Sequence, residues 1–230
     1  MGTQNQLVQK IHETGVPTIV VLVGGRPLSV NWIAQNVQAL VQAWEPGSLG
    51  GRALANILAG KVNPSAKLPI SIPRHSGQIQ MIYNHKPSQY FHKYIDGPST
   101  PLYPFGFGLS YTRFAYSSLK LSHTRISDKD SFTASIELTN VGDREGTEVV
   151  QLYIRDIYSS ATRPVKELKD FARVTLKPGE KKTVTFTVTP DKLAYWNRNM
   201  QYGVEKGEFE IMIGSSSQDK DLKKVKMEVL

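Results

Sequence analysis

The chain has 230 residues, a net charge of +8, 40% hydrophobic residues and no cysteine. These totals are typical of a globular protein of one or two domains, and the lack of cysteine excludes disulfides, cysteine-ligated zinc and a thiol nucleophile. The positive charge does not indicate nucleic-acid binding, because the basic residues are scattered among acids, as in Lys166-Glu167-Leu168-Lys169-Asp170.

The sequence predicts neither a membrane span nor an export signal. The longest aliphatic run, Ile19 to Val23, is far shorter than the roughly 20 residues that cross a bilayer. Residues 1–15 are polar and lack the apolar stretch of a secretory signal.

Residues 1–75 are predicted to form part of an α/β domain. The continuous β-branched run at 18–23 is typical of a strand covered on both faces of a parallel sheet. The other expected elements are a helix over 6–14, a helix over 50–58 and a short edge strand over 67–72. The apolar segment 37–44 is compatible with a strand or a helix, and its shortness favours a strand. These strands are too few for a complete doubly wound sheet, so the region is expected to be the last part of such a domain.

Residues 113–230 are predicted to be an all-β sandwich. Apolar residues alternate with polar ones in short segments that are separated by turn sequences such as Lys177-Pro178-Gly179-Glu180. The expected strands cover 131–139, 148–155, 182–189, 208–214 and 223–229. Without cysteines the sandwich has no immunoglobulin-type disulfide, which leaves a fibronectin type III style of fold.

Residues 76–112 have no periodicity and connect the two regions. The segment contains Pro101-Leu102-Tyr103-Pro104-Phe105-Gly106-Phe107-Gly108-Leu109-Ser110-Tyr111, which is too rich in rings for a disordered linker. We expect it to lie across both regions, with Tyr103, Phe105, Phe107 and Tyr111 inserted into them.

The best candidate for a ligand-facing segment is Trp44 to Gly51, where a predicted strand ends and a helix begins. The carboxyl ends of parallel strands form the crevice in which α/β proteins bind ligands, so Glu45 and Ser48 are candidate substrate-binding residues. The alternative is a purely structural turn. Asp96 is better explained as a turn residue in Asp96-Gly97-Pro98. His85 and His92 lie in the aromatic segment and are candidates to line a cleft, but no histidine has metal-ligand spacing.

Several blocks of the chain resemble the C-terminal part of glycoside hydrolase family 3. They are AWEPGSLGGRALANILAGKVNPSAKLPISIP, YNHKP, KYIDGPSTPLYPFGFGLSYTRFAYSSL, LTNVGDREGTEVVQLYIRD and VKELKDFARVTLKPGEKKTVTFTVTPDKLAYW. The resemblance implies the end of an α/β sandwich domain over 1–75, an interdomain segment over 76–112 and a fibronectin type III-like domain over 113–230. It is closest to bacterial periplasmic β-glucosidases and implies a periplasmic or extracellular location.

The same resemblance implies that the catalytic residues lie outside this chain. The family's aspartate nucleophile belongs to an N-terminal (β/α)8 barrel, and its glutamate acid/base precedes the first helix here, so no catalytic residue is assigned. Where the family usually has an acid after Pro-Gly-Gln/Glu, this chain has Leu49. The loop 157–165 is similar to one that in some relatives reaches toward the active site, which makes Arg163 a candidate substrate contact.

The sequence therefore predicts a fragment of a retaining β-glycosidase that is inactive alone and needs no cofactor or metal. Its expected partners are the missing barrel and, in the intact enzyme, a β-linked oligosaccharide or aryl glycoside, with no nucleic acid and no membrane. The incomplete sheet leaves an open edge, which predicts self-association or a partner. The alternative is a non-catalytic module that binds carbohydrate or protein, or serves as a scaffold.

Overall fold

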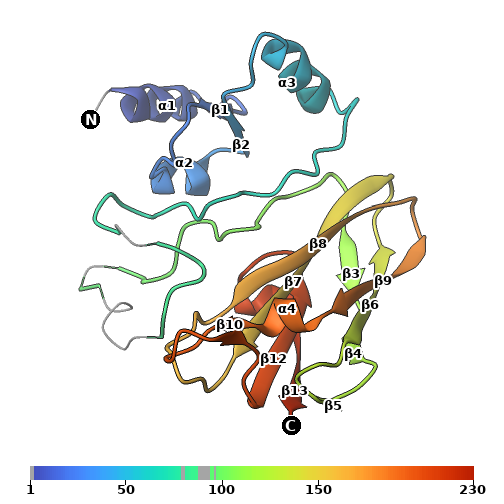
Figure 1. The fold of residues 1–230 in the computed structure, drawn as a ribbon. Helices are drawn as coiled ribbons and strands as arrows, with labels where there is room; N and C mark the ends of the chain where they lie inside the picture. Colours follow the sequence, from blue (N-terminus) through green and yellow to red (C-terminus); the bar gives the residue numbers. More distant parts are fainter. Residues whose placement is uncertain (1–2, 79–80, 88–93, 96) are drawn as a thin grey trace. The chain divides into compact units, whose positions relative to one another are not determined.

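The structure is a computed structural model that describes residues 3–78, 81–87, 94–95 and 97–230. The chain divides into two compact units (Figure 1). Unit 1 comprises Met1–Val62, Ile72–Met81 and Thr100–Tyr103, and unit 2 comprises Asn63–Ser71, Ile82–Ser99 and Pro104–Leu230.

The larger sheet of unit 2 has five strands in the order β5-β13-β12-β7-β8. In chain order these strands are β5 (Arg125–Ile126), β7 (Gly146–Asp156), β8 (Glu167–Leu176), β12 (Gly207–Gly214) and β13 (Leu222–Val229). Neighbouring strands are antiparallel, apart from the short parallel pair of β5 and β13. The expected strands at 148–155, 208–214 and 223–229 are confirmed, whereas β8 was not predicted.

The smaller sheet is built around β6 (Phe132–Asn140), which pairs antiparallel with three other strands. These partners are β3 (Phe114–Tyr116), β4 (Lys120–Leu121) and β9 (Lys181–Val188). The alternation read from the sequence sets the inward face, because Phe132, Ala134, Ile136 and Leu138 are at most 2% exposed. With buried residues of the larger sheet they form one continuous hydrophobic core, so the predicted β-sandwich is confirmed.

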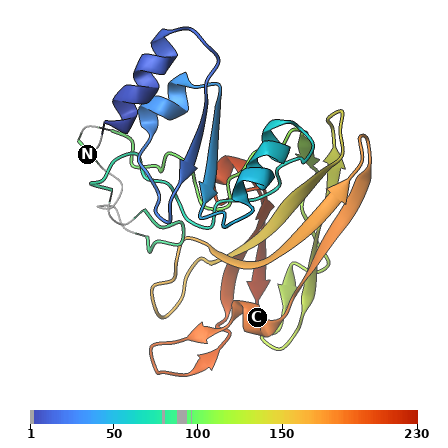
Figure 2. The ribbon, with the colours of Figure 1, turned by 90° about the horizontal axis from the view of Figure 1, so that it is seen from above.

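A short hairpin and two short helical turns complete unit 2 (Figure 2). The hairpin consists of β10 (Tyr195–Trp196) and β11 (Tyr202–Gly203) and follows helix α4 (Pro190–Leu193). A 3-10 turn, η1 (Asp219–Asp221), precedes β13. One face of the hairpin is exposed to solvent, because Trp196 and Tyr202 are 61% and 56% exposed.

Unit 1 contains a two-stranded parallel sheet of β1 (Ile19–Val23) and β2 (Ala39–Trp44). Its helices are α1 (Gln4–Glu13), α2 (Asn31–Asn36) and α3 (Gly50–Leu58). The α/β prediction is confirmed, although α2 was not anticipated. The expectation that β1 is covered on both faces is wrong for this chain, because Ile19 and Val23 are 50% and 62% exposed. Two strands and three helices in the described part of unit 1 are too few to bury both faces.

The edge strand expected over 67–72 is wrong, since no strand forms there among the described residues. Instead, irregular backbone around Leu68 exchanges hydrogen bonds with the aromatic segment: Leu68 N–H donates to the Phe107 carbonyl and Gly106 N–H donates to the Leu68 carbonyl, both at 2.8 Å. Pro69 prevents a continuous ladder because it has no N–H to donate.

Part of the expectation for the aromatic segment is confirmed within unit 2. The Phe105 ring stacks on Tyr83 with centroids 4.1 Å apart and packs against a buried cluster that contains Tyr153 and Met212. Tyr111 is not inserted in this way, because it is 41% exposed and the Arg144 guanidinium lies 5.9 Å from its ring centroid.

Candidate functional site

The first candidate site is the carboxyl edge of the parallel sheet in unit 1, where Glu45 directly follows β2. Glu45 and Ser48 are both exposed, so their side chains are accessible to a ligand. A Cβ built on Gly25 would lie 3.0 Å from Oε1 of Glu45, which shows that the Glu45 side chain extends over the end of β1. The structure thus places Glu45 at the carboxyl ends of both strands, where ligand sites of α/β proteins form.

The backbone at this edge adopts conformations that most residues avoid. Trp44 has φ 53, in the left-handed region that is strained for a bulky side chain, and its carbonyl accepts a 2.9 Å hydrogen bond from Gly24 N–H. Gly47, with φ 69, completes the turn before α3. Strained backbone conformations are often found at functional sites. In this chain the strained turn sets the position of the Glu45 side chain.

The second candidate is Arg163, in the loop 157–165 of unit 2, whose guanidinium is held on two sides. It donates to the carboxylate of Glu167 and lies 4.5 Å from the ring centroid of Tyr195. The Arg163 side chain is 17% exposed, and its Nε has no hydrogen-bond partner. A guanidinium fixed in this way is preorganised for planar recognition, and the predicted contact with substrate stays a prediction.

Two carboxyl groups near the loop 157–165, those of Asp156 and Glu205, have opposite pKa shifts. Burial raises the pKa of Asp156 to about 6, Arg163 opposes this rise and Glu205 adds to it. Glu205 accepts hydrogen bonds from the Ser160 backbone N–H at 2.9 Å and from the Ser160 hydroxyl at 2.6 Å, and these bonds lower the pKa of Glu205. Such opposed shifts occur at functional sites and in structural ion networks alike.

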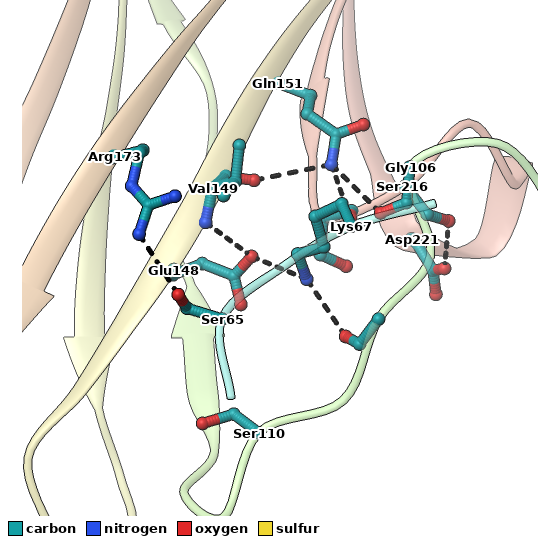
Figure 3. A network of polar contacts seen from close by, with 12 residues as sticks. Ser65, Lys67, Gly106, Ser110, Glu148, Val149, Gln151, Arg173, Ser216 and Asp221 are labelled. Atoms are coloured by element: carbon teal, nitrogen blue, oxygen red, sulfur yellow. Dashed lines mark hydrogen bonds and ion pairs between the residues drawn. The ribbon is translucent and has the colours of Figure 1, made fainter. Parts of the chain in front are cut away.

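Sequence reasoning missed a third group of polar residues, which joins residues 63–71 to β7 within unit 2 (Figure 3). Lys67 Nζ lies 2.8 Å from Glu148 Oε1 and donates to the Gly108 carbonyl at 3.1 Å. The same Glu148 oxygen accepts a 2.9 Å hydrogen bond from Val149 N–H. No spacing rule predicts an ion pair between residues so distant in the chain. The sequence does contain one hint, because Glu148 is a charged residue at an inward position of a predicted strand, and a buried charge requires a partner.

Gln151 extends this group toward the aromatic segment. Its Nε2 donates to the carbonyls of Gly106 at 3.1 Å and Ser215 at 2.8 Å, and its Oε1 accepts from the Tyr153 hydroxyl at 2.5 Å. Burial raises the pKa of Tyr153 strongly, which keeps the phenol protonated as the donor. These contacts fix loops to the sandwich, and they present no group to solvent that would perform chemistry.

The remaining sequence candidates are placed as follows. The His85 carbonyl accepts a 3.0 Å hydrogen bond from Val165 N–H, which ties it to the Arg163 loop. His92 and Asp96 lie outside the described residues. Among the residues that the structure describes, no group of three or more acids or histidines is arranged to hold a metal ion. In the same part of the chain, no helix combines the length and hydrophobicity needed to span a bilayer.

Comparison with known families identifies both regions. Residues 1–111 match the model of the glycosyl hydrolase family 3 C-terminal domain, and residues 148–217 match the fibronectin type III-like domain. The chain is 47% identical over 231 aligned residues to a protein named β-xylosidase from Formosa agariphila, with 99% of this chain and 32% of that protein covered. It is 44% identical to the periplasmic β-glucosidase of Salmonella typhimurium, with 94% and 29% covered.

Solved structures agree with these matches. A β-glucosidase from Erythrobacter marinus superposes with a TM-score of 0.95 at 43% identity, covering 100% of this chain and 30% of that one. A β-glucosidase from Listeria innocua in complex with glucose gives a TM-score of 0.92 at 37% identity, covering 98% and 32%. The chain thus spans about 30% of the proteins that it matches. It belongs to glycoside hydrolase family 3, of which it contains the C-terminal domain followed by the fibronectin type III-like domain.

Proposed function

We propose that this chain is the C-terminal part of a retaining β-glycosidase that acts on terminal β-linked sugars. The observation that supports this function is the match of both domains, in this order, to proteins named β-glucosidase and β-xylosidase. Because the chain spans about 30% of those proteins, the proposal places the nucleophile and the acid/base carboxyl in the remaining part.

A retaining glycosidase needs two carboxyl groups roughly 5–5.5 Å apart, one as nucleophile and one as acid/base. The nucleophile forms a covalent glycosyl-enzyme intermediate, which water then hydrolyses. On our proposal this chain supplies neither carboxyl group. Its contribution is to line the sugar pocket from the carboxyl edge of the β1–β2 sheet, with Glu45 and Ser48 accepting or donating hydrogen bonds to sugar hydroxyls. For unit 2 we propose, separately, that Arg163 of the loop 157–165 contacts the substrate.

The test is hydrolysis of chromogenic aryl β-glucoside and aryl β-xyloside by the purified chain, alone and mixed with a family 3 fragment that carries the barrel and the acid/base segment. We expect no turnover by the chain alone and turnover on mixing. Glu45→Gln and Arg163→Ala should then raise KM or lower kcat of the mixture, while Glu13→Gln, an exposed glutamate of α1, should change neither. Hydrolysis by the chain alone would refute the proposal.

The proposal also covers the location, the assembly and the domain boundaries of the chain. A periplasmic or extracellular location is supported by the relative named periplasmic β-glucosidase. Contact with the barrel, or self-association, is supported by the half-exposed apolar residues Ile19 and Val23 of β1, since exposed apolar surface is typical of interaction sites. We also retain the proposed domain boundaries at residues 75/76 and 112/113.

A further inference from the structure

The outer face of the β10–β11 hairpin carries two aromatic side chains that are exposed to solvent. Trp196 and Tyr202 face each other directly across the hairpin and are 61% and 56% exposed. Their ring centroids are 5.4 Å apart, with planes tilted by 52°. Tyr195 has the opposite orientation and is 4% exposed, as expected for alternating side chains of a strand. The buried Tyr195 ring therefore attaches the hairpin to the rest of unit 2, whereas the rings of Trp196 and Tyr202 are exposed to solvent.

The turn that holds these rings is fixed by its own hydrogen bonds. The Asn197 side-chain oxygen accepts from the N–H groups of Asn199 at 2.9 Å and Gln201 at 3.0 Å. The Asn197 and Gln201 backbones pair at 3.0 Å. Met200 has φ 57 and is 74% exposed at the tip. A rigid turn lowers the entropy cost of binding at the two rings.

The hairpin is also tied to the loop 157–165 through Ser160. The Ser160 hydroxyl lies 3.3 Å from the Tyr195 hydroxyl and 2.6 Å from Glu205 Oε1. Figure 2 shows the hairpin, drawn in orange, projecting from the sandwich of unit 2. The two rings thus lie on a supported projection rather than on a free loop.

The other side chains of the hairpin define the kind of ligand that suits it. Between Tyr195 and Gly203 the only charged residue is Arg198, and Arg198, Asn199 and Gln201 are all exposed. Amide and guanidinium groups donate to hydroxyl oxygens, while the electron-rich faces of Trp and Tyr attract polarised C–H groups. A pyranose offers both chemistries, with C–H groups on its faces and hydroxyls around its rim.

We propose that the outer face of the β10–β11 hairpin is a binding site for a neutral oligosaccharide. One sugar unit stacks on Trp196 and a neighbouring unit contacts Tyr202, whose tilted plane suits a glycan chain that twists between units. Arg198, Asn199 and Gln201 donate to hydroxyls at the edges. The proximity of Ser160 connects this site to the loop that carries Arg163.

The test is isothermal titration calorimetry of the chain with cellopentaose and with xylopentaose, which requires no hydrolysis and is therefore independent of the proposed function. We expect saturable binding of at least one of the two, weakened at least about ten-fold in Trp196→Ala and in Tyr202→Ala. Trp196→Phe, which keeps a ring, should retain most of the affinity. Phe171→Ala is the matched control, because Phe171 is 60% exposed on β8 and should leave binding unchanged.

Three outcomes would overturn the proposal. They are no heat of binding with either pentasaccharide, binding that survives both alanine substitutions, and self-association of the wild-type chain that Trp196→Ala abolishes while sugars have no effect. The third outcome would assign the rings to a protein contact. Unchanged far-ultraviolet circular dichroism and thermal unfolding of each variant would establish that lost binding does not come from lost folding.

Discussion

Lys67 and Glu148 form an ion pair at 2.8 Å whose side chains are only 12% and 8% exposed. Lys67 comes from the irregular segment before the aromatic stretch, and Glu148 comes from an inward position near the start of β7. Both charges have further partners, the Gly108 carbonyl for Lys67 and the Val149 N–H for Glu148. The pair therefore links the loop segments of unit 2 to its sandwich, and each charge depends on the other for its compensation in the interior.

Breaking this pair should destabilise unit 2 more than any surface ion pair does. Lys67→Met leaves the Glu148 carboxylate shielded from water without its cation, a change that costs about 3–5 kcal/mol of unfolding free energy. The double variant Lys67→Met/Glu148→Gln should lose less than the sum of the two single variants, because it removes both charges. Urea unfolding followed by intrinsic fluorescence measures these differences.

The matched control for that experiment is Lys10→Met, which removes the cation of an exposed pair with Glu13. Those side chains are 75% and 59% exposed, and such pairs contribute about 0–1 kcal/mol. Equal losses at Lys67 and Lys10 would mean that the interior pair is as well solvated as the surface one, contrary to the structure.

Two features of Gly106 should make its replacement costly, namely its positive φ and the lack of space for a Cβ. Gly179 shares only the first feature, so a comparison of the two glycines separates the two effects. Gly106 has φ +79, and a Cβ there would lie 2.1 Å from Oε1 of Gln151, whereas Gly179 has φ +74 with nothing within 4 Å. Gly179→Ala should cost about 1–3 kcal/mol from its backbone alone. Gly106→Ala should cost clearly more, because Gln151 must also move and its hydrogen bonds to Gly106 and Tyr153 are disturbed. Thermal unfolding of the two variants checks this order, and a reversed order would contradict the role given to Gln151.

The sequence was most informative where one periodicity dominated. In β6, alternation from Phe132 to Leu138 predicted both the strand and its buried face. In β8 the alternation is confined to the second half, where Ala172, Val174 and Leu176 are more buried than their neighbours. The first half, Glu167 to Phe171, is half-buried or exposed in no alternating order, and its pairing with β7 shifts register between Leu152 and Tyr153. Helix α2 was missed because it has six residues and no side-chain cap, so neither period nor capping marks it.

The candidate site was only partly readable from the sequence. The position of Glu45 at the end of β2 followed from the rule for parallel strands. The contacts of Arg163 did not, since the Tyr195 ring beneath it is separated from it by two strands and a helix of the chain. The exposure of Trp196 was equally hidden, because a two-residue strand carries no periodic pattern that distinguishes an outward ring from an inward one.

Unit 1 should exchange its amide hydrogens faster than unit 2. Among the described residues of unit 1, the buried apolar side chains are Val30, Ile33 and Ile72, whereas the sandwich has a cluster of twenty buried residues. Local opening costs less free energy where fewer apolar contacts are lost. Hydrogen exchange followed by mass spectrometry should therefore show weaker protection in β1 and β2 than in β6 and β7. Equal protection of both units would indicate a single cooperative unfolding unit.

Asp156 should make the stability of the chain depend on pH in the direction opposite to an ordinary ion-paired acid. Its folded-state pKa is raised by burial to about 6 from an ordinary value of 3.8, so the folded state holds a proton that the unfolded state has released between these two values. The contribution of Asp156 to the free energy of unfolding is therefore fully present below about pH 4. It decreases as the pH rises from about 4 to about 6, and it does not change further above about pH 6.

Replacing the Asp156 carboxyl by an amide removes the loss of stability that its ionisation causes. The direction of the resulting change in stability is therefore defined in advance. Asp156→Asn should raise the urea midpoint relative to wild type more at about pH 7.5 than at about pH 4, because only at the higher pH does the wild type carry the buried charge. Asp143→Asn is the control, since Asp143 is 87% exposed and its effect should differ little between the two conditions. If Asp156→Asn instead destabilises the chain more at the higher pH, then the attraction of Arg163 outweighs burial, and Asp156 is an ordinary partner of that arginine.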